Sequence, residues 1–382
     1  MTSIDRTTIL VFSDWYLPGF KAGGPIRSLV NLVNAVPYDF YIVTGNKDHH
    51  SEVKYEGVEF DCWVKLNDRI HVQYLNDEKI NAREFRKIMD EINPDFVYLN
   101  SLFSPKFTLL PMRVLRSMEH PPQSIVAPRG MLKSGALSVK GFKKKWFLRV
   151  AKWLNWYGSV KWHATNKEEI GEIRKVFGLR SVIHLSPNLS APVVANKARK
   201  EKLTRELRLV CIARISPEKG ILEAIRFLKT ARLEGQIFCD FIGTQQNTEY
   251  LGQCRAEAAG VPNASISFPG EIHPDCIQST LCDYHFFYLA SWGENFGHSI
   301  SEALYSGMPV IISDRTPWQG LEEKKAGWVI SLETEAFSVA LNAAMNMTQA
   351  DYTIWSDSAR NFAKEISNDP TRIQMAIGLF QK

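Results

Sequence analysis

Two glutamates stand eight positions apart in the segment SWGENFGHSISEALYSGMPVIIS, which runs from Ser291 to Ser313. Glu294 lies in a glycine-flanked loop after the apolar run HFFYLA, and Glu302 lies in the short helical pattern that follows. Ionised carboxylates accept hydrogen bonds from neighbouring hydroxyl groups, such as those of a sugar or a ribose. The alternative is a solvated loop residue at 294 and a helix-surface charge at 302. The spacing alone does not decide between these two interpretations.

The start of the same helix offers a second kind of contact. The segment has the pattern of a buried strand, a loop and a helix, and ligands of open α/β sheets bind where the strands end. The amides of Asn295, Phe296 and Gly297 would point outward there, where the helix dipole favours an anion such as a phosphate. A carboxylate would repel that anion, so Glu294 suits hydroxyl groups instead.

Two cations flank a tight loop in the segment CIARISPEKGI. Arg214 and Lys219 would lie at the carboxyl end of the same sheet, where two cations suit a diphosphate. The alternative is a pair of exposed surface cations. Gly243 and Gly270 end two further predicted strands, where a small residue lets a flat group such as a nucleobase approach the backbone.

Composition limits the class of protein. The chain has 382 residues, 45% of them hydrophobic and 23% charged, which favours two folded domains and argues against bulk disorder. A net charge of +5 is too weak to indicate nucleic acid but suits an anionic ligand or membrane surface. The six cysteines form no CxxC pair, and no Asp-x-Asp-like pair or His/Cys cluster has metal-ligand spacing. We therefore expect a cytoplasmic protein with no metal site, no bound cofactor and no nucleic-acid partner.

The pattern of strand, loop and helix runs through two halves of similar size, which indicates an α/β fold with two Rossmann-like domains facing each other across a cleft. Polar, aperiodic sequence separates the halves, and two amphipathic helices close the chain. We expect an N-terminal domain over 1–188, a linker over 189–206, a C-terminal domain over 207–362, and a C-terminal helix over 363–382 that packs back on the N-terminal domain.

Five segments, in this order, resemble the donor half of retaining glycosyltransferases of the glycogen-synthase-like group, often called family 4, which have the GT-B fold. They are ARISPEKG, FIG, FPGEI, SWGENFGHSISEALYSGMPVIISD and GWVI. The resemblance covers most of residues 208–330. The spacing between Glu294 and Glu302 is its most specific element.

The resemblance implies roles for individual residues. In such enzymes an arginine and a lysine bind the donor diphosphate, the first glutamate contacts the transferred sugar, and the second binds the ribose. The implied catalytic residues are Glu294, Arg214 and Lys219. The implied donor-binding residues are Gly23, Gly24, Arg214, Lys219, Gly243, Glu271, Ile272, Asn295, Phe296, Gly297 and Glu302.

The N-terminal half resembles the family more loosely. LPGFKAGGPIRSLVNL is similar to its glycine-rich first loop, which would place Gly23 and Gly24 near the donor phosphates. PRGML and HATNKEE are similar to stretches of bacterial surface-polysaccharide members. Many members carry a histidine after the strand DFVYLN, where this chain has NSL from Asn100, so no acceptor-side histidine is assigned. Arg129 is the candidate acceptor-side contact, and a structural arginine that binds loop carbonyls is the alternative.

The segment KGFKKKWFLRVAKWLNWYG, residues 140–158, combines aromatic and basic residues at helical spacing. This pattern suits an anionic membrane interface. The alternative is a helix packed on the first sheet with a solvated basic face.

The predicted activity is transfer of a hexose-type sugar from a nucleotide-diphosphate sugar to a hydroxyl of a glycan acceptor, with retention of configuration. A lipid-linked acceptor in lipopolysaccharide, O-antigen or exopolysaccharide biosynthesis would place the enzyme on the inner face of the plasma membrane. Two alternatives remain at this point: a nucleotide-sugar epimerase of similar fold, and a non-catalytic nucleotide-sugar or glycan-binding protein.

Overall fold

The computed structural model describes residues 6–133, 137, 141–190 and 199–381. The chain divides into two compact units, Met1–Leu189 together with Pro370–Lys382, and Ser190–Asp369. Residues 191–198 of the expected linker and Lys140 of the basic segment lie outside the described residues.

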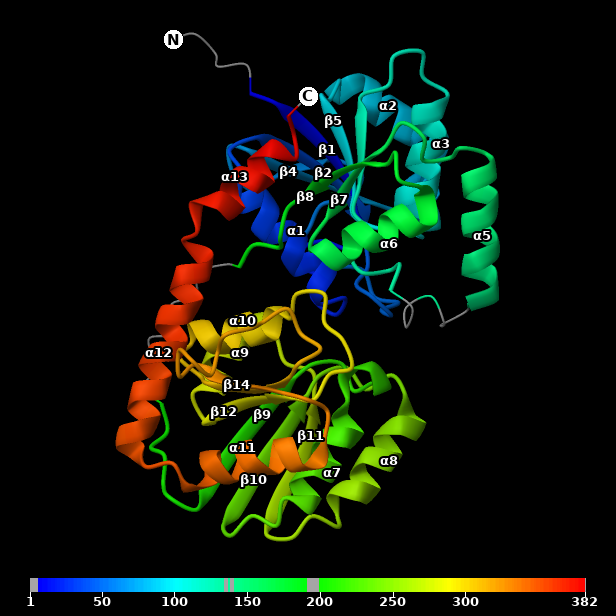
Figure 1. The fold of residues 1–382 in the computed structure, drawn as a ribbon. Helices are drawn as coiled ribbons and strands as arrows, with labels where there is room; N and C mark the ends of the chain where they lie inside the picture. The colour runs from blue at the N-terminus through cyan, green and yellow to red at the C-terminus, as the bar shows by residue number, and fades with distance from the viewer. Residues whose placement is uncertain (1–5, 134–136, 138–140, 191–198, 382) are drawn as a thin grey trace. The chain divides into compact units, whose positions relative to one another are not determined.

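The first unit is built on an eight-stranded sheet in the order β3-β4-β2-β1-β5-β6-β7-β8 (Figure 1). All neighbours pair in parallel except β3, which runs antiparallel to β4 at the edge. The strands are β1 (Thr8–Phe12), β2 (Asp39–Gly45), β3 (Trp63–Lys65), β4 (Ile70–Leu75), β5 (Phe96–Leu99), β6 (Gln123–Val126), β7 (Lys161–Ala164) and β8 (Val182–Leu185).

Alternate residues of β1 enter two different cores, because successive side chains of a strand point to opposite faces. Ile9 and Val11 pack with helices α1 and α13, and Leu10 and Phe12 pack with helices of the other face. The sheet is therefore covered on both sides, as parallel sheets require. The helices are α1 (Gly24–Ala35), α2 (Ala82–Ile92), α3 (Leu110–Arg116), α5 (Gly141–Trp153), α6 (Lys167–Phe177) and α13 (Pro370–Gly378).

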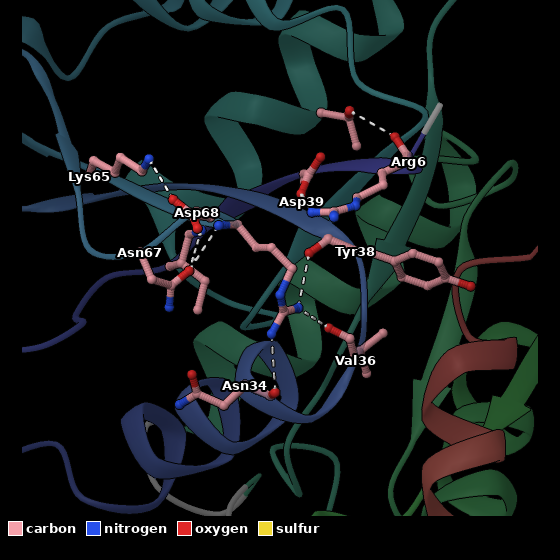
Figure 2. Close-up of polar contacts among 11 residues, drawn as sticks. Arg6, Asn34, Val36, Tyr38, Asp39, Lys65, Asn67 and Asp68 are labelled. Carbon is pink, nitrogen blue, oxygen red and sulfur yellow. Dashed lines mark hydrogen bonds and ion pairs between the residues drawn. The ribbon is translucent and has the colours of Figure 1, made fainter. Parts of the chain in front are cut away.

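The end of α1 is held by the side chain of Arg69, which precedes β4. Its Nη1 donates to the carbonyl oxygens of Val36 at 2.5 Å and Tyr38 at 3.3 Å, and its Nη2 to that of Asn34 at 3.5 Å (Figure 2). The amide of Arg69 itself donates to Asn67 Oδ1 at 2.9 Å. A guanidinium there both satisfies the last carbonyls of the helix and complements its dipole.

The second unit has a six-stranded, all-parallel sheet in the order β11-β10-β9-β12-β13-β14. Its strands are β9 (Glu206–Ile212), β10 (Gln236–Ile242), β11 (Ala264–Gly270), β12 (Phe286–Leu289), β13 (Val310–Ser313) and β14 (Gly327–Ile330). Its helices are α7 (Ile221–Thr230), α8 (Thr248–Ala258), α9 (Ile277–Leu281), α10 (His298–Tyr305), α11 (Thr334–Asn346) and α12 (Gln349–Ser367). Every residue of β12 is buried, as its continuous apolar run predicts.

Several elements differ from the expectation. Strands β3, β4 and β8 and helix α3 were not predicted, because β3 has only three residues, β4 mixes polar residues into its pattern, and β8 has no buried residue. Three helices, not two, close the described part of the chain, since α12 ends at Ser367 and α13 begins at Pro370. Proline lacks the amide that would continue a helix, so it starts a new one.

The described end of the expected linker is held on the second unit. The amide of Lys200 donates to the carbonyl of Cys282 at 2.9 Å, and that of Lys202 donates to Gln349 Oε1 at 2.6 Å. No helix among the described residues is long and apolar enough to cross a membrane.

Candidate functional site

The direction of strand addition reverses at β9 in the second unit. The chain proceeds from β9 to β10 and β11 on one side, and β12 then pairs with the other side of β9. Open α/β sheets bind ligands at the carboxyl ends of the strands at such a switch point. Lys219 follows β9 and Glu294 follows β12, so the strand order brings together two residues that the sequence had singled out.

Lys219 and Glu294 form an ion pair at this switch point. Lys219 Nζ donates to Glu294 Oε1 at 2.6 Å, and the two side chains are only 20% and 9% exposed. An ion pair shielded from water is electrostatically stronger than one on the surface. The sequence predicted that both residues belong to one site, but not that they bind each other.

The two loops that carry this pair are joined by backbone contacts. The carbonyl of Glu218 accepts hydrogen bonds from the amide of Trp292 at 3.0 Å and from Ser291 Oγ at 3.1 Å. Gly220 has a φ of 62°, and a Cβ there would lie 1.8 Å from the carbonyl oxygen of Ala290. Only glycine allows this close approach, which fixes the position of the lysine loop beside the glutamate loop.

The loop after Glu294 is also ordered by its backbone. The amide of Glu294 donates to the carbonyl of Arg315 at 3.0 Å, and the carbonyl of Phe296 accepts from Trp318 Nε1 at 2.5 Å. Gly297 is the residue that precedes α10. Glu302 lies inside α10 and is half-buried. That the amides of residues 295–297 bind an anion stays a prediction.

The other predicted donor residues lie along the same edge of the sheet. Arg214 is exposed in the loop after β9. Gly243 follows β10, and a Cβ there would lie 1.9 Å from the carbonyl of Ala213, so the strand ends approach closely at this point. Glu271, exposed, and Ile272, half-buried, follow β11. Their roles as donor contacts remain predictions.

The first unit has its own switch point, between β1 and β5. Ser104 Oγ, after β5, donates to Asp14 Oδ1, after β1, at 2.7 Å. Asn100 Nδ2 donates to Ser13 Oγ at 3.3 Å and to the carbonyl of Pro25 at 3.2 Å. Burial raises the pKa of the Asp14 carboxyl above its ordinary value. A half-buried carboxyl group with a raised pKa at a switch point is a candidate for a functional role.

The glycine-rich loop lies beside this second switch point. Gly23 precedes α1 and Gly24 is its first residue. The loop is held by Asp48, whose Oδ2 accepts hydrogen bonds from the amides of Phe20 at 2.8 Å and Lys21 at 3.0 Å. Gly23 and Gly24 belong to the first unit, whereas Lys219 and Glu294 belong to the second.

Arg129 donates to three protein acceptors. Its Nε binds Asn100 Oδ1 at 3.0 Å, its Nη1 binds Asn188 Oδ1 at 2.5 Å, and its Nη2 binds the Tyr98 hydroxyl at 2.8 Å. Because each guanidinium nitrogen has a partner within the protein, the contacts favour the structural role over the acceptor-side one. The acceptor-side role stays an untested prediction.

A buried histidine completes this network. Tyr98 Oη lies 2.8 Å from His163 Nδ1, and His163 Nε2 lies 2.8 Å from the carbonyl of Ser186. Burial, together with the charge of Arg129, lowers the pKa of His163 to about 3. The neutral ring then donates from Nε2 to the carbonyl and accepts at Nδ1 from the tyrosine.

The second unit matches a known protein family. Residues 194–362 match the family described as glycosyl transferases group 1. The chain carries a group 1 glycosyltransferase domain. The chain is accordingly a retaining glycosyltransferase that uses a nucleotide-sugar donor, and the matched residues include both Lys219 and Glu294.

Solved structures resemble the glycosyltransferase along its whole length. Sucrose-phosphate synthase from Thermosynechococcus elongatus is 16% identical with a TM-score of 0.68, covering 97% of both chains. HepE from Anabaena, in complex with UDP and glucose, is 16% identical with a TM-score of 0.67, covering 96% of this chain and 97% of its own. WaaG, a glycosyltransferase involved in lipopolysaccharide biosynthesis, is 14% identical with a TM-score of 0.64, covering 98% and 99%. These likenesses confirm the GT-B fold. A search of curated proteins gave no match.

Asp14 and Ser104 were not predicted from the sequence as residues of a site. An aspartate directly after a buried strand was visible in FSDW, but its importance depends on the strand order, which places β5 beside β1. Within the described residues, no group of three or more His, Cys, Asp or Glu side chains could hold a metal ion.

Proposed function

We propose that the enzyme transfers a hexose from a UDP-sugar to a hydroxyl of a lipid-linked glycan, as a step of surface-polysaccharide biosynthesis. The observation that carries this proposal is the Lys219–Glu294 pair at the switch point of the group 1 domain. It supplies a cation for the diphosphate and a carboxylate for sugar hydroxyls in one place.

In this proposal the bond between the sugar C1 and the β-phosphate oxygen breaks, and UDP leaves with the bonding electrons. The acceptor hydroxyl forms the new bond at C1 on the same face, and its proton leaves with the departing phosphate. Lys219, Arg214 and the amides of residues 295–297 stabilise the negative charge that develops on UDP. Preorganised charges of this kind are commonly the largest contribution to catalysis.

The remaining roles divide between the two units. Glu294 accepts hydrogen bonds from the transferred sugar and Glu302 from the ribose, while Gly243, Glu271 and Ile272 lie near the base. The first unit binds the acceptor, with Gly23 and Gly24 near the donor phosphates. Arg129 supports the acceptor side through Asn100.

The choice of UDP and of the pathway is supported by the solved structures. HepE is described in complex with UDP-glucose, and WaaG acts in lipopolysaccharide biosynthesis. Such acceptors are attached to lipid, which fits an enzyme peripheral to the inner face of the plasma membrane. The group 1 match favours a transferase over the epimerase and the binding protein.

The test is nucleotide release from a panel of UDP-, GDP-, ADP- and dTDP-sugars, with and without membrane lipid extract. Release of UDP that requires the extract supports the proposal. Interconversion of the sugar without extract would instead indicate an epimerase, and binding without turnover would indicate a binding protein. Release of another nucleotide would contradict the UDP assignment alone.

A further inference from the structure

Helix α5 exposes three large aromatic side chains on one stripe. Phe142 is 86% exposed, Trp146 61% and Trp153 83%. Together with Arg149 they are spaced by four, three and four residues, which places them on the same side of a helix. Apolar residues that cluster on a protein surface, unlike ones scattered singly, mark an interaction site.

The charge of α5 has a single sign. Its sequence GFKKKWFLRVAKW contains five cations and no acidic residue. Five equals the formal net charge of the whole chain, +5, so the rest of the chain is neutral overall. Lys143, Lys145, Arg149 and Lys152 are exposed beside the aromatic stripe. Aromatic residues flanked by cations match a bilayer surface that carries negative charge.

The opposite side of α5 packs on the first unit and borders an apolar groove. Leu148 and Ala151 are buried, and the rings of Phe147 and Phe103 meet edge to face with centroids 5.8 Å apart. The groove has a volume of about 340 Å³ and lies between α5 and the turn and helix at residues 105–116. Its lining includes the apolar side chains of Leu109, Leu110, Phe147, Val150 and Leu154.

One part of the groove carries polar groups. Arg113 lines it, and the guanidinium of Arg116 lies 5.4 Å from the centre of the Trp156 ring, which also lines the groove. Trp156 Nε1 is buried and has no hydrogen-bond partner among the described residues. A mostly apolar groove with arginines and an indole N–H suits a hydrocarbon chain that bears an anionic head group.

We propose that α5 lies on an anionic membrane and that the groove behind it binds one acyl chain of an anionic phospholipid. The exposed stripe of Phe142, Trp146 and Trp153 enters the interface, and the cations beside it contact lipid phosphates. This proposal does not depend on the proposed reaction, because membrane binding by α5 and acyl-chain binding in the groove are both measured without donor or acceptor. Failure of these measurements leaves the glycosyltransferase assignment intact.

The membrane surface is tested by flotation with phosphatidylglycerol-containing vesicles and with pure phosphatidylcholine vesicles. The chain is expected to float with the anionic vesicles only. Each of K145E and R149E is expected to weaken binding by about fivefold or more, since one cation near such a surface contributes about 1 kcal/mol. The matched control is K175E, at an exposed position of α6. Absence of flotation, or an equal loss of vesicle binding in K175E, overturns the assignment of α5 as a membrane-binding surface.

The groove is tested with a short-chain, chain-brominated phosphatidylglycerol below its micelle concentration, which quenches nearby tryptophans. Quenching is expected in the native chain and is expected to fall in W156F. Filling the groove with V150F should also abolish most of it, and V339F, at a position 73% exposed in the second unit, is the control.

Should V150F fail to fold, L154F fills the groove from its rim, where Leu154 is 44% exposed. Quenching that persists in the filled variant shows that the chain binds elsewhere and overturns the groove assignment. A chain-brominated phosphatidylcholine of the same chain length is the head-group control, and equal quenching by it overturns the requirement for an anionic head group.

Discussion

At the scale of single residues, the contact between Lys219 Nζ and Glu294 Oε1 determines how the site can bind charge. It places a cation 2.6 Å from one carboxylate oxygen, in a position where both side chains are largely shielded from water. An isolated carboxylate beside a diphosphate would repel it, whereas a paired one does so much less. The pair therefore explains how a glutamate could lie in the loop that is predicted to bind phosphate.

Glu294 and Glu302 are expected to differ when each is made neutral. Glu294→Gln should lower kcat about 10²-fold or more, because the interaction with the reacting sugar is strongest in the transition state. Glu302→Gln should weaken donor binding about tenfold with little change in kcat, the loss of roughly one hydrogen bond to a charged group. Calorimetry with the donor and nucleotide release measure the two quantities.

The control for both variants is Glu335→Gln, at an exposed position of α11. Small and equal effects at 294 and 302 would mean that neither glutamate contacts the donor.

Asp14 provides a test of the acceptor side. Asp14→Asn preserves an oxygen that can accept from Ser104 Oγ but removes the charge. Transfer to the acceptor is expected to fall about tenfold, because an amide accepts a weaker hydrogen bond from the acceptor hydroxyl than a charged carboxylate does, while slow donor hydrolysis without acceptor is unchanged. Comparison with Asp90→Asn, an exposed carboxylate of α2, controls for a general effect. Equal loss of hydrolysis and transfer would assign Asp14 to the fold rather than to the acceptor.

His163 is expected to make the first unit sensitive to acid. Its pKa is lowered from 6.5 to about 3 by burial, so below pH 6.5 the unfolded chain binds a proton that the folded chain does not. The free energy of unfolding should therefore fall as pH drops, by up to about 1.4 kcal/mol per pH unit from this group. Denaturant unfolding at several pH values measures the slope, and His163→Asn should flatten it. An unchanged slope in the variant would show that other groups cause the dependence.

At the scale of elements, the close approach of two loops positions the ion pair. The helix α7 begins directly after Gly220, whose backbone lies against the carbonyl of Ala290 at the end of β12. This contact joins the first helix after β9 to the strand that carries Glu294. A change at Gly220 should therefore affect the site although the residue has no side chain.

Gly220→Ala is expected to destabilise the second unit by more than about 1 kcal/mol and to weaken donor binding, since the new Cβ would meet Ala290 O at 1.8 Å and φ is 62°. The matched control is Gly252→Ala in α8, where a Cβ meets nothing within 4 Å. That change should stabilise the helix by about 0.5–1 kcal/mol. Thermal unfolding with and without donor measures both. A harmless Gly220→Ala would show that the loops are not held by this contact.

Helices and strands were predictable from the sequence where a local pattern of residues was enough to determine them. The apolar run of β12 was predicted as a buried strand and is confirmed. β3 was missed because three residues, none of them buried, are too few to show an alternating apolar pattern. Asp14 and the contacts of Arg129 were missed because they depend on which strands are neighbours, and that order is set by packing across distant segments. The pairing of Lys219 with Glu294 depends on the same information.

At the scale of the whole molecule, the chain leaves its first unit and returns to it. Helix α13 and the residues after it belong to the first unit, where Lys161 Nζ donates to the carbonyls of Leu379 at 2.9 Å and Gln381 at 3.0 Å. His184 Nε2 also lies 2.6 Å from the carbonyl of Met375. The core of the first unit is therefore completed by residues that follow the entire second unit.

Substitution of Phe380 should measure how much the returning segment stabilises the first unit. The ring of Phe380 is 2% exposed and lies about 6 Å from the rings of Tyr38, Phe40, Phe96 and Tyr98. Phe380→Ala should lower the free energy of unfolding of the first unit by about 3–5 kcal/mol, the usual cost of a large cavity.

Hydrogen exchange distinguishes the two units in this variant. Amides of β1 and β5 should lose protection, and those of β9 and β12 should keep it, because the two sheets have separate cores. Leu179→Ala, at a position 84% exposed in the first unit, should change neither set by more than about 0.5 kcal/mol. Loss of protection in β9 and β12 equal to that in β1 and β5 would mean that the units unfold as one. Unchanged protection in β1 and β5 would mean that the returning segment adds nothing to the first core.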